Sequence, residues 1–393
     1  MKKIYCLNKI SPIGLKVLPS TYEVTGNLDE AKAILVRSAI MHEMALQKSV
    51  LAVARAGAGV NNIPLDLYAK EGVVVFNTPG ANANGVNELT IAGMLLAARD
   101  IYGGMKWVEA NKEDVYINKT MEKAKSAFAG TELLGKTLGV LGIGAIGSKV
   151  IKAAYGLGMN IITFGSSQKT IDRQKPLLPS EVVYAKTIEE FYRASDYISL
   201  NAPLNSATRG MVNKEAFKEM KDGVILLNFA RDALVNDDDL KEAITSGKVR
   251  KYVTDFPNHK TANMESVIAF PHLGASTAEA EDNCAKMAAS QVVEYIENGN
   301  LINAVNYPNI SLGPKTKDHR LIVLHLHQEG IANSIIKTVE KKANIKQLVS
   351  AEKGEFAITI IDFNDVKGGC ENETCLLDLL SEVEGLIRVR VIH

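Results

Sequence analysis

The chain of 393 residues is poor in cysteine and has no surplus of charge of either sign. Its four scattered cysteines form no Cys-x-x-Cys pair, which argues against a disulfide framework and favours a reducing cytoplasm. Lys and Arg number 45, as do Asp and Glu, so no basic excess indicates a nucleic-acid or membrane-surface partner. Cys370 and Cys375 leave open a local pair or a metal site, but an exposed loop with incidental thiols is favoured and no metal is expected.

Long apolar runs are also absent. No run reaches the roughly 18 residues that a membrane-spanning helix needs. The start, Met-Lys-Lys-Ile-Tyr-Cys, resembles a short strand and lacks the apolar core of a signal peptide. With 46% apolar residues, the chain can fill the cores of two or three domains.

One stretch carries the strongest chemical signal. Leu138 to Leu141 reads as a buried strand, and Gly142, Gly144 and Gly147 follow it with the spacing Gly-x-Gly-x-x-Gly before a helical pattern over Ser148–Leu157. Such glycines make a tight turn, let a pyrophosphate approach the backbone and let the helix pack on the strand. The stretch therefore predicts dinucleotide binding, with a packing turn as the alternative.

Short strands alternate with helical patterns along most of the chain. Residues 1–97 suggest strands at Lys3–Leu7, Ala33–Arg37, Leu51–Ala54 and Val73–Asn77. Two glycine-containing loops follow such strands, and Arg55-Ala-Gly-Ala-Gly-Val60 is suited to hold a carboxylate or phosphate on its amides. A plain turn is the alternative for each loop.

The fold class expected is α/β, with two doubly wound domains and a C-terminal ferredoxin-like βαββαβ domain. The expected boundaries are 1–97 for a substrate-binding domain completed by 284–310, 98–283 for the nucleotide domain, 311–319 for a linker and 320–393 for the last domain.

Three polar residues stand where strands of the nucleotide domain end: Arg231, Asp255 and His272. A guanidinium can hold a carboxylate in two places and polarise a neighbouring oxygen. An imidazole can take a hydroxyl proton while a hydride leaves for a nicotinamide. Together these residues indicate hydride transfer from a 2-hydroxy acid, although each alone would more often be structural.

The order and spacing of several motifs resemble the D-2-hydroxyacid dehydrogenase family over residues 1–310. The motifs are Arg55-Ala-Gly-Ala-Gly-Val60, Asn77-Thr-Pro, Gly130-Thr-Glu-Leu, Gly142-Ile-Gly-Ala-Ile-Gly147, Asn201-Ala-Pro-Leu, Thr208-Arg-Gly210, Asn228-Phe-Ala-Arg231 and Pro271-His-Leu-Gly-Ala-Ser-Thr277. Residues 320–393 resemble an ACT domain, an amino-acid-sensing unit.

The resemblance implies an NAD-dependent enzyme of the branch that oxidises 3-phosphoglycerate to phosphohydroxypyruvate, the first step of the phosphorylated route to serine. It also implies a homodimer or homotetramer, in which residues 320–393 take part in assembly and serine inhibits weakly or not at all. His327 and Asn344 match serine-contacting positions, but the loop Gln328-Glu329-Gly330 is shorter than usual.

Site residues follow from the same resemblance. Arg231 and His272 match the catalytic arginine and histidine, and His259 stands where a catalytic glutamate is expected. The expected cofactor contacts are Gly142, Gly144, Ala145, Ile146, Gly147, Gly165, Ser166, Pro203, Thr208, Phe229, Ala230, Arg231, Asp255, His272, Gly274 and Ala275. The expected substrate contacts are Arg55, Ala56, Gly57, Ala58, Gly59, Lys70 and Lys125, the last across a dimer interface.

Two departures from the family pattern concern chemistry. Gly165 replaces the acidic residue that holds the ribose hydroxyls, which predicts weak discrimination against NADP. His259 replaces the glutamate that orients the catalytic imidazole, and either Glu265 or water is an alternative partner. A hydroxypyruvate or glyoxylate reductase of the same family, and a dinucleotide-sensing protein without turnover, are the rival functions.

Overall fold

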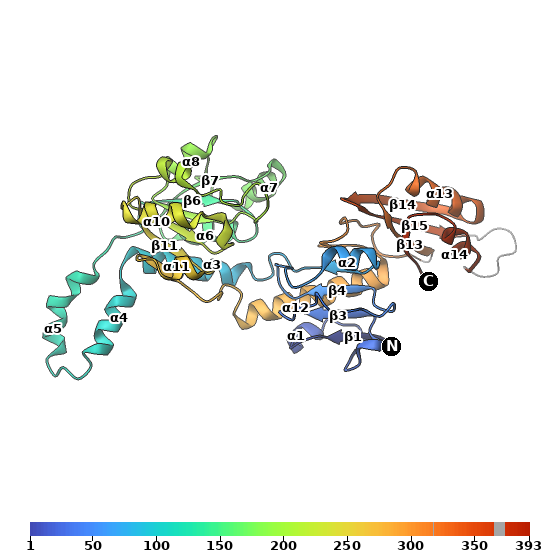
Figure 1. Ribbon diagram of the computed structural model, residues 1–393, viewed down its shortest axis with the longest axis horizontal. Coiled ribbons are helices and arrows are strands. Elements are labelled where there is room, and N and C mark those ends of the chain that lie inside the picture. Colours follow the sequence, from blue (N-terminus) through green and yellow to red (C-terminus); the bar gives the residue numbers. More distant parts are fainter. Residues whose placement is uncertain (317, 365–373) are drawn as a thin grey trace. The chain divides into compact units, whose positions relative to one another are not determined.

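The computed structural model describes residues 1–316, 318–364 and 374–393, in two compact units (Figure 1). Unit 1 comprises Met1–Ala81 and Glu281–His393, and unit 2 comprises Asn82–Ala280. The Cys370–Cys375 pair considered above involves Cys370, which lies outside the described residues. Within the described part of the chain, no helix is long and apolar enough to cross a membrane.

Unit 1 begins with a parallel sheet in the order β2-β1-β3-β4-β5. Its strands are β1 (Lys2–Cys6), β2 (Tyr22–Thr25), β3 (Ala33–Val36), β4 (Ala52–Arg55) and β5 (Val74–Phe76), and its short helices are α1 (Pro12–Leu15) and α2 (Leu65–Lys70). The long helix α12 (Ala278–Asn298) returns from unit 2 and packs its small residues, among them Cys284, Ala285 and Ala288, in the core of this sheet.

Unit 2 is a seven-stranded parallel sheet in the order β12-β11-β10-β9-β6-β7-β8. Its strands are β6 (Thr137–Leu141), β7 (Asn160–Phe164), β8 (Val183–Tyr184), β9 (Tyr197–Leu200), β10 (Val224–Asn228), β11 (Val249–Thr254) and β12 (Val267–Ala269). Its helices are α3 (Ala83–Ala98), α4 (Ile101–Ala110), α5 (Ile117–Ala124), α6 (Gly147–Gly156), α7 (Gln168–Gln174), α8 (Ile188–Ala194), α9 (Lys214–Glu219), α10 (Asp237–Thr245) and α11 (His259–Ala262). The chain reverses its strand order beside β6, which is where such sheets bind ligands.

Helix α3 belongs to unit 2 and not, as its sequence position suggested, to the residues before it. Its residues Val86, Met94 and Ala97 share a core with β6 and β10. A Cβ at Gly93 would lie 2.8 Å from the ring of Phe229 and 2.9 Å from Val253, so glycine is needed for this close approach. The unit boundary therefore falls at residues 81 and 82 and not at 97 and 98.

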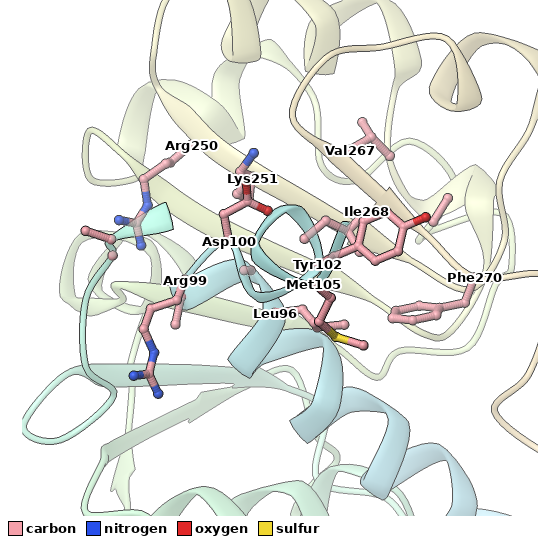
Figure 2. A pocket seen from close by; sticks show the side chains of 15 residues that line it. Leu96, Arg99, Asp100, Tyr102, Met105, Arg250, Lys251, Val267, Ile268 and Phe270 are labelled. Carbon is pink, nitrogen blue, oxygen red and sulfur yellow. The ribbon is translucent and has the colours of Figure 1, made fainter. Parts of the chain in front are cut away.

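Helices α4 and α5 form a hairpin that extends from the rest of unit 2 (Figure 1). Neither helix contains a buried residue, and Tyr102, Met105 and Val115 are 61%, 65% and 84% exposed. A cavity of about 670 Å³ lies at the base of the hairpin, walled by Tyr102, Ile268 and Phe270 among others (Figure 2). None of its lining residues belongs to the glycine loop after β6.

The C-terminal module is an antiparallel sheet in the order β14-β15-β13-β16 with two helices. Its elements are β13 (His319–Leu326), α13 (Ile331–Lys342), β14 (Asn344–Lys353), β15 (Phe356–Asn364), α14 (Thr374–Ser381) and β16 (Leu386–Ile392). This βαββαβ order and the two parallel sheets confirm the predicted fold class.

The module does not form a separate domain joined by a linker, because one face of its sheet completes the core of unit 1. Ile322, Leu324 and Ile358 lie in the same apolar cluster as Tyr295 and Ala288 of α12, whereas the alternate residues of β13 pack under α13 and α14. Residues 311–319, the expected linker, are also hydrogen-bonded to the end of α12 and the segment that follows it. Asn300 Nδ2 donates to the carbonyl of Gly313 at 2.9 Å, and Lys315 N donates to Asn298 Oδ1 at 2.9 Å. Residues 320–393 therefore contribute to the core of unit 1.

Two arginines of the module bind the carbonyls at the end of α12. Arg390 donates to the carbonyls of Tyr295 and Ile296 at 2.7 and 2.8 Å, and its guanidinium lies 4.7 Å from the centre of the Tyr295 ring. Arg320 donates to the carbonyl of Asn298 at 2.8 Å and forms two hydrogen bonds, at 2.6 and 2.8 Å, with the Asp362 carboxylate. These cations satisfy carbonyls that a helix leaves unpaired at its C-terminus.

The Arg320–Asp362 pair is buried, with side chains 0% and 1% exposed. We expect Arg320→Met to lower the free energy of unfolding by about 3–5 kcal/mol, because Asp362 would stay buried without its partner. Urea denaturation measures this loss. Lys260→Met, which removes the exposed Lys260–Asp238 pair, is the control and should change stability by no more than about 0.5 kcal/mol. A loss of less than about 1 kcal/mol in the Arg320 variant would contradict the assignment.

His325 gives the module a dependence on pH. It is 2% exposed, its Nδ1 lies 2.8 Å from the carbonyl of Leu326 and its Nε2 lies 3.0 Å from Thr359 Oγ1. Since a carbonyl only accepts, Nδ1 carries the proton of the neutral ring and Nε2 accepts from the hydroxyl. Burial lowers the pKa of His325 below its ordinary value.

Because the folded chain resists a proton that the unfolded chain accepts, stability should fall as the pH drops below about 6.5, by at most about 1.4 kcal/mol per pH unit. Denaturation of the His325→Gln variant at pH 7 and pH 5 tests this, and the difference between the two pH values should shrink relative to the unmodified chain. His259→Gln, at an exposed histidine, should leave that difference unchanged. An equal acid sensitivity in the unmodified chain and His325→Gln would show that another group is responsible.

Candidate active site

The glycine loop after β6 lies at the carboxyl edge of the sheet in unit 2. Gly142 has φ +92°, and a Cβ there would lie 3.2 Å from the carbonyl oxygen of Asn201. A Cβ at Gly147 would lie 2.1 Å from the carbonyl oxygen of Gly142, so the first turn of α6 approaches the strand only with glycine there. Gly144, by contrast, faces open space.

The residues between these glycines present unpaired donors. Among the described residues, the amides of Gly144, Ala145 and Ile146 have no hydrogen-bond acceptor, and α6 has no side-chain cap. Free amides at the start of a helix attract an anion, and the open side of Gly144 leaves room for one. The loop therefore fits the pyrophosphate of a dinucleotide.

The ribose side of this loop lacks a carboxylate. Gly165 follows β7 with φ +81°, a conformation that disfavours other residues. Ser166 Oγ accepts from the amide of Ile143 at 2.9 Å, and Ser167 caps α7 through the amide of Thr170. Farther along the edge, Thr208 Oγ1 donates to the carbonyl of Pro203 at 2.6 Å and closes the loop after β9.

Asn228, at the end of β10, presents Arg231. Its buried side chain accepts from the amides of Ala230 and Arg231 at 3.2 and 3.3 Å and donates to the carbonyl of Arg231 at 2.8 Å. Asn228 Nδ2 also donates to the hydroxyl of Tyr252 at 3.0 Å. The turn Phe229–Arg231 is thus held from inside the sheet, and Arg231 Nη1 donates to the carbonyl of Ala230 at 2.6 Å.

Asp255, at the end of β11, holds the loop that carries His272. Its carboxylate, 2% exposed, accepts from the amides of Leu273 and Gly274 at 2.7 and 2.8 Å. His272 has φ +55°, which costs a residue with a side chain about 1–2 kcal/mol. Burial raises the pKa of the Asp255 carboxyl, while the two amide donors and His272 act in the opposite direction. These two hydrogen bonds fix the backbone of His272 at the sheet edge.

Phe256 is the side chain against which His272 lies. The two ring centres are 4.5 Å apart at an interplanar angle of 48°, and the guanidinium of Arg231 lies 5.1 Å from the centre of the same Phe256 ring. Within the described residues, no side chain hydrogen-bonds to the ring nitrogens of His272. The structure thus brings together Arg231, Asp255 and His272 as the sequence suggested.

His259 is not part of this cluster. It is exposed and begins α11, behind the capping box formed by Asn258 and Thr261. The expectation that it replaces a glutamate beside His272 is therefore wrong in this structure. Phe256, and not His259, packs against the imidazole of His272. Glu265, the other alternative, is also exposed and has no bond to His272.

The Arg55–Val60 loop lies in unit 1, at the carboxyl end of β4. The loop is pinned because Asn77 Nδ2 donates to the carbonyl of Ala58 at 2.6 Å and Thr78 N donates to that of Gly57 at 3.1 Å. Arg55 donates through Nε to the carbonyl of Arg37 at 2.9 Å and through Nη1 to that of Gly59. The amides of Ala58, Gly59 and Val60 have no acceptor among the described residues, so the loop can receive an anion.

Lys70 is not brought to this loop. It ends α2, four residues before β5 begins at Val74, and Val74 pairs with Ala52 at the start of β4. Arg55 closes the same strand at its other end, about 10 Å away at the usual rise per residue. In a parallel sheet a helix returns the chain to the opposite edge, so Lys70 lies there, next to Glu71, whose carbonyl accepts from Arg388 of the module at 3.2 Å.

Two further predicted residues lie elsewhere. Lys125 follows α5 in the hairpin, is 67% exposed and pairs with Glu122. In the module, His327 pairs with Glu352 at 2.9 Å near the β14–β15 turn, whereas Asn344 begins β14 and pairs with Asn364. The ten residues of β14 separate these two positions by about 30 Å, so one copy cannot bring both to one small ligand.

The sequence analysis missed Phe256, Asn228 as a support of Arg231, and Ser166 as a brace of the glycine loop. Asn228 carried a signal, because a polar residue ending a buried strand needs a hydrogen-bond partner. Phe256 carried no such signal, since an aromatic residue next to Asp255 could equally well belong to the hydrophobic core. Its role depends on the bend that Asp255 imposes on a loop 17 residues later.

Comparison with known proteins gives the family. Residues 91–274 match the NAD binding domain of the D-isomer specific 2-hydroxyacid dehydrogenases. D-3-phosphoglycerate dehydrogenase of Methanocaldococcus jannaschii is 30% identical over 91% of this chain and 68% of its own length, and hydroxypyruvate reductase of Thermotoga maritima is 37% identical over 70% and 82%.

Among solved structures, cofactor (NAD+) bound 3-phosphoglycerate dehydrogenase of Entamoeba histolytica is 27% identical, with a TM-score of 0.61 over 79% of this chain and 99% of that one. Together with the glycine loop and the Arg231–His272 cluster, these similarities confirm the resemblance drawn from the sequence. The chain belongs to the D-isomer specific 2-hydroxyacid dehydrogenases, a family of NAD-dependent oxidoreductases.

Proposed function

We propose that this enzyme oxidises 3-phospho-D-glycerate to 3-phosphohydroxypyruvate with NAD, and catalyses the reverse reduction. The observation that carries the proposal is the cluster at the carboxyl edge of the unit 2 sheet, where Arg231 and His272 lie on the same Phe256 ring. The names of the relatives support the choice of substrate, since 3-phosphoglycerate dehydrogenases recur among them.

In this proposal the chain's own groups handle charge and proton. Arg231 holds the substrate carboxylate through its planar fork of donors and polarises the C2 oxygen. His272 takes the hydroxyl proton while the C2–H bond breaks and its electron pair leaves as hydride. NAD, held by the amides of Gly144–Ile146, supplies the nicotinamide that accepts that hydride.

Recognition of the substrate phosphate is assigned to the Arg55–Val60 loop. Three amides without acceptors and the neighbouring guanidinium of Arg55 suit a dianion. Lys70 is left out of this assignment because it lies at the other edge of its sheet. Lys125 is assigned to the substrate of a second copy, since it belongs to the exposed hairpin.

We propose that the chain forms a homodimer through the α4–α5 hairpin. The hairpin exposes Tyr102, Met105, Val108 and Tyr116. The cavity at its base is lined partly by charged side chains, among them Arg99 and Arg250, and partly by the apolar Leu96, Ile268 and Phe270, which suit side chains of the same kind (Figure 2). A second copy offers both features and can exchange them reciprocally about a twofold axis.

A hydroxypyruvate reductase is the second candidate function. It is favoured by the higher identity, 37%, to hydroxypyruvate reductase of Thermotoga maritima, and by the distance of Lys70 from the Arg55 loop. Hydroxypyruvate lacks the phosphate that the first proposal assigns to the unpaired amides of that loop. The two functions therefore differ in a single measurable preference.

Initial rates of NADH oxidation with phosphohydroxypyruvate and with hydroxypyruvate measure this preference. We expect kcat/KM to favour the phosphorylated substrate by about 100-fold or more, because charge-assisted hydrogen bonds contribute about 1.5–3 kcal/mol each. Arg55→Met should reduce the preference at least about tenfold. Lys70→Met is the matched control and should leave it unchanged. Equal kcat/KM values for the two substrates would favour the reductase.

Cofactor choice follows from Gly165. Without a carboxylate at this position nothing repels a 2′-phosphate, while Ser166 and Ser167 are already engaged with the amides of Ile143 and Thr170. We expect NAD to be preferred over NADP by less than about 1000-fold in kcat/KM, or about 4 kcal/mol. Gly165→Asp should raise the preference, because Asp tolerates positive φ better than most residues. A larger preference in the unmodified enzyme would show that discrimination has another source.

A further inference from the structure

The ring of Phe256 is shared by the two groups assigned to catalysis. The guanidinium carbon of Arg231 lies over the ring, 5.1 Å from its centre, and the imidazole of His272 packs against it at 4.5 Å. Arg231 comes from the loop after β10 and His272 from the loop after β12, so no other described contact ties the two side chains to a common surface. Phe256 thus contacts side chains from both loops, which Phe229 and Phe270 also join, with their ring centres 6.0 Å apart.

The backbone that carries the ring is held on both sides. The amide of Phe256 donates to Thr254 Oγ1 at 3.0 Å, and the capping box of Asn258 and Thr261 follows two residues later. Asn258 Nδ2 also donates to Asp237 Oδ2 at 2.9 Å, which fastens this turn to α10. Phe256 is therefore a fixed surface for its two neighbours.

His272 and Arg231 both need such a surface. The imidazole has no hydrogen-bond partner on its nitrogens among the described residues, and Arg231 is held only by one bond from Nη1 to the carbonyl of Ala230. The face of an aromatic ring carries partial negative charge and attracts a guanidinium above it. The same face limits the rotation of a ring that packs against it.

We propose that Phe256 is a positioning residue of this enzyme, which sets the imidazole of His272 and the guanidinium of Arg231 at a fixed separation. The proposal rests on the proposed function for what the two groups do. By packing against the imidazole, the ring of Phe256 restricts the orientation of His272, as a carboxylate hydrogen-bonded to the imidazole would. A flat aromatic face at this position is then required for turnover, whereas apolar bulk alone is not enough.

Phe256→Leu and Phe256→Tyr separate these two requirements. The leucine variant keeps an apolar side chain and loses the flat face, and we expect kcat to fall about tenfold with a rise in KM for the 2-oxo acid. KM for NADH should change less than about twofold, since the amides assigned to the dinucleotide belong to the loop after β6 and Phe256 belongs to the turn after β11. The tyrosine variant should restore both constants. Phe217→Leu, which removes a core ring on α9, is the control for a loss of stability alone.

Two kinetic outcomes would overturn the proposal: a leucine variant with unchanged kcat and 2-oxo acid KM, or a tyrosine variant as impaired as the leucine variant. If the leucine variant does not fold, Phe256→Met takes its place as the apolar variant without a flat face, and its kcat and 2-oxo acid KM are compared with those of the tyrosine variant. An NMR measurement covers the case in which the unmodified enzyme shows no turnover, which would refute the proposed function itself.

The chain has seven histidines, so the imidazole C–H resonance of His272 can be assigned by its loss in His272→Asn. With the ring of Phe256 4.5 Å away, this resonance should shift in Phe256→Leu and hold its place in Phe217→Leu. An unchanged resonance in Phe256→Leu would show that the two side chains do not meet, and would overturn the proposal whatever the activity.

Discussion

The grip of the Asp255 carboxylate on two backbone amides is the interaction on which the candidate active site depends. By accepting from Leu273 and Gly274, one buried side chain joins the end of β11 to the loop after β12. That bond pair compensates for the positive φ of His272 and for the burial of a carboxyl whose pKa rises in consequence. The pairing of β12 with β11 brings this loop close to Phe256, and the two bonds to Asp255 fix the turn that carries the imidazole. The backbone position of His272, the proposed acid–base group, is thus set by hydrogen bonds to a carboxylate within the protein itself.

A second constraint acts in unit 1, where the C-terminal module and the first sheet share one core. Arg320 and Arg390 bind the carbonyls at the end of α12, and the close approach of β13 requires Gly299, since a Cβ there would lie 2.6 Å from Ile322. Arg388 of the module also donates directly to the carbonyls of Lys48 and Glu71, which lie beside the first sheet. The module is a part of unit 1 in this chain, and not an appendage to it.

Much of this fold could be predicted because buried strands and glycine turns leave local marks. The strands predicted at Lys3–Leu7, Ala33–Arg37, Leu51–Ala54 and Val73–Asn77 form within one residue of those bounds, and Gly142–Gly147 has the predicted close packing and open backbone. The edge strands β2, β8 and β12 were missed because two to four residues at a sheet edge carry little apolar pattern. The α4–α5 hairpin was missed because its apolar residues are exposed and interspersed with charges, so its pattern resembles a polar loop.

The errors in the site have a different cause. Lys70 was placed with Arg55 by family position, but the direction of a parallel sheet sends the end of α2 to the opposite edge. His259 was given the place of a glutamate by spacing along the chain, yet the short turn after Asp255 brings Phe256 to the imidazole instead. The positions of Lys70 and His259 both depend on where the chain turns in three dimensions. Residue type and spacing can name the participants in a reaction, but only the backbone decides which of them meet.

Transfer of an isotope tests the central claim, that the Arg231–His272 cluster serves direct hydride transfer from C2 of the substrate. The enzyme is given NAD and 3-phospho-D-glycerate that carries deuterium at C2, and the NADH formed is examined by mass spectrometry. The account predicts one deuterium at C4 of the nicotinamide, with none lost to water, because the C2–H bond breaks with its electron pair. NADH without deuterium would mean that the hydrogen passes through an exchanging group, and no NADH at all would mean that this hydroxy acid is not the substrate.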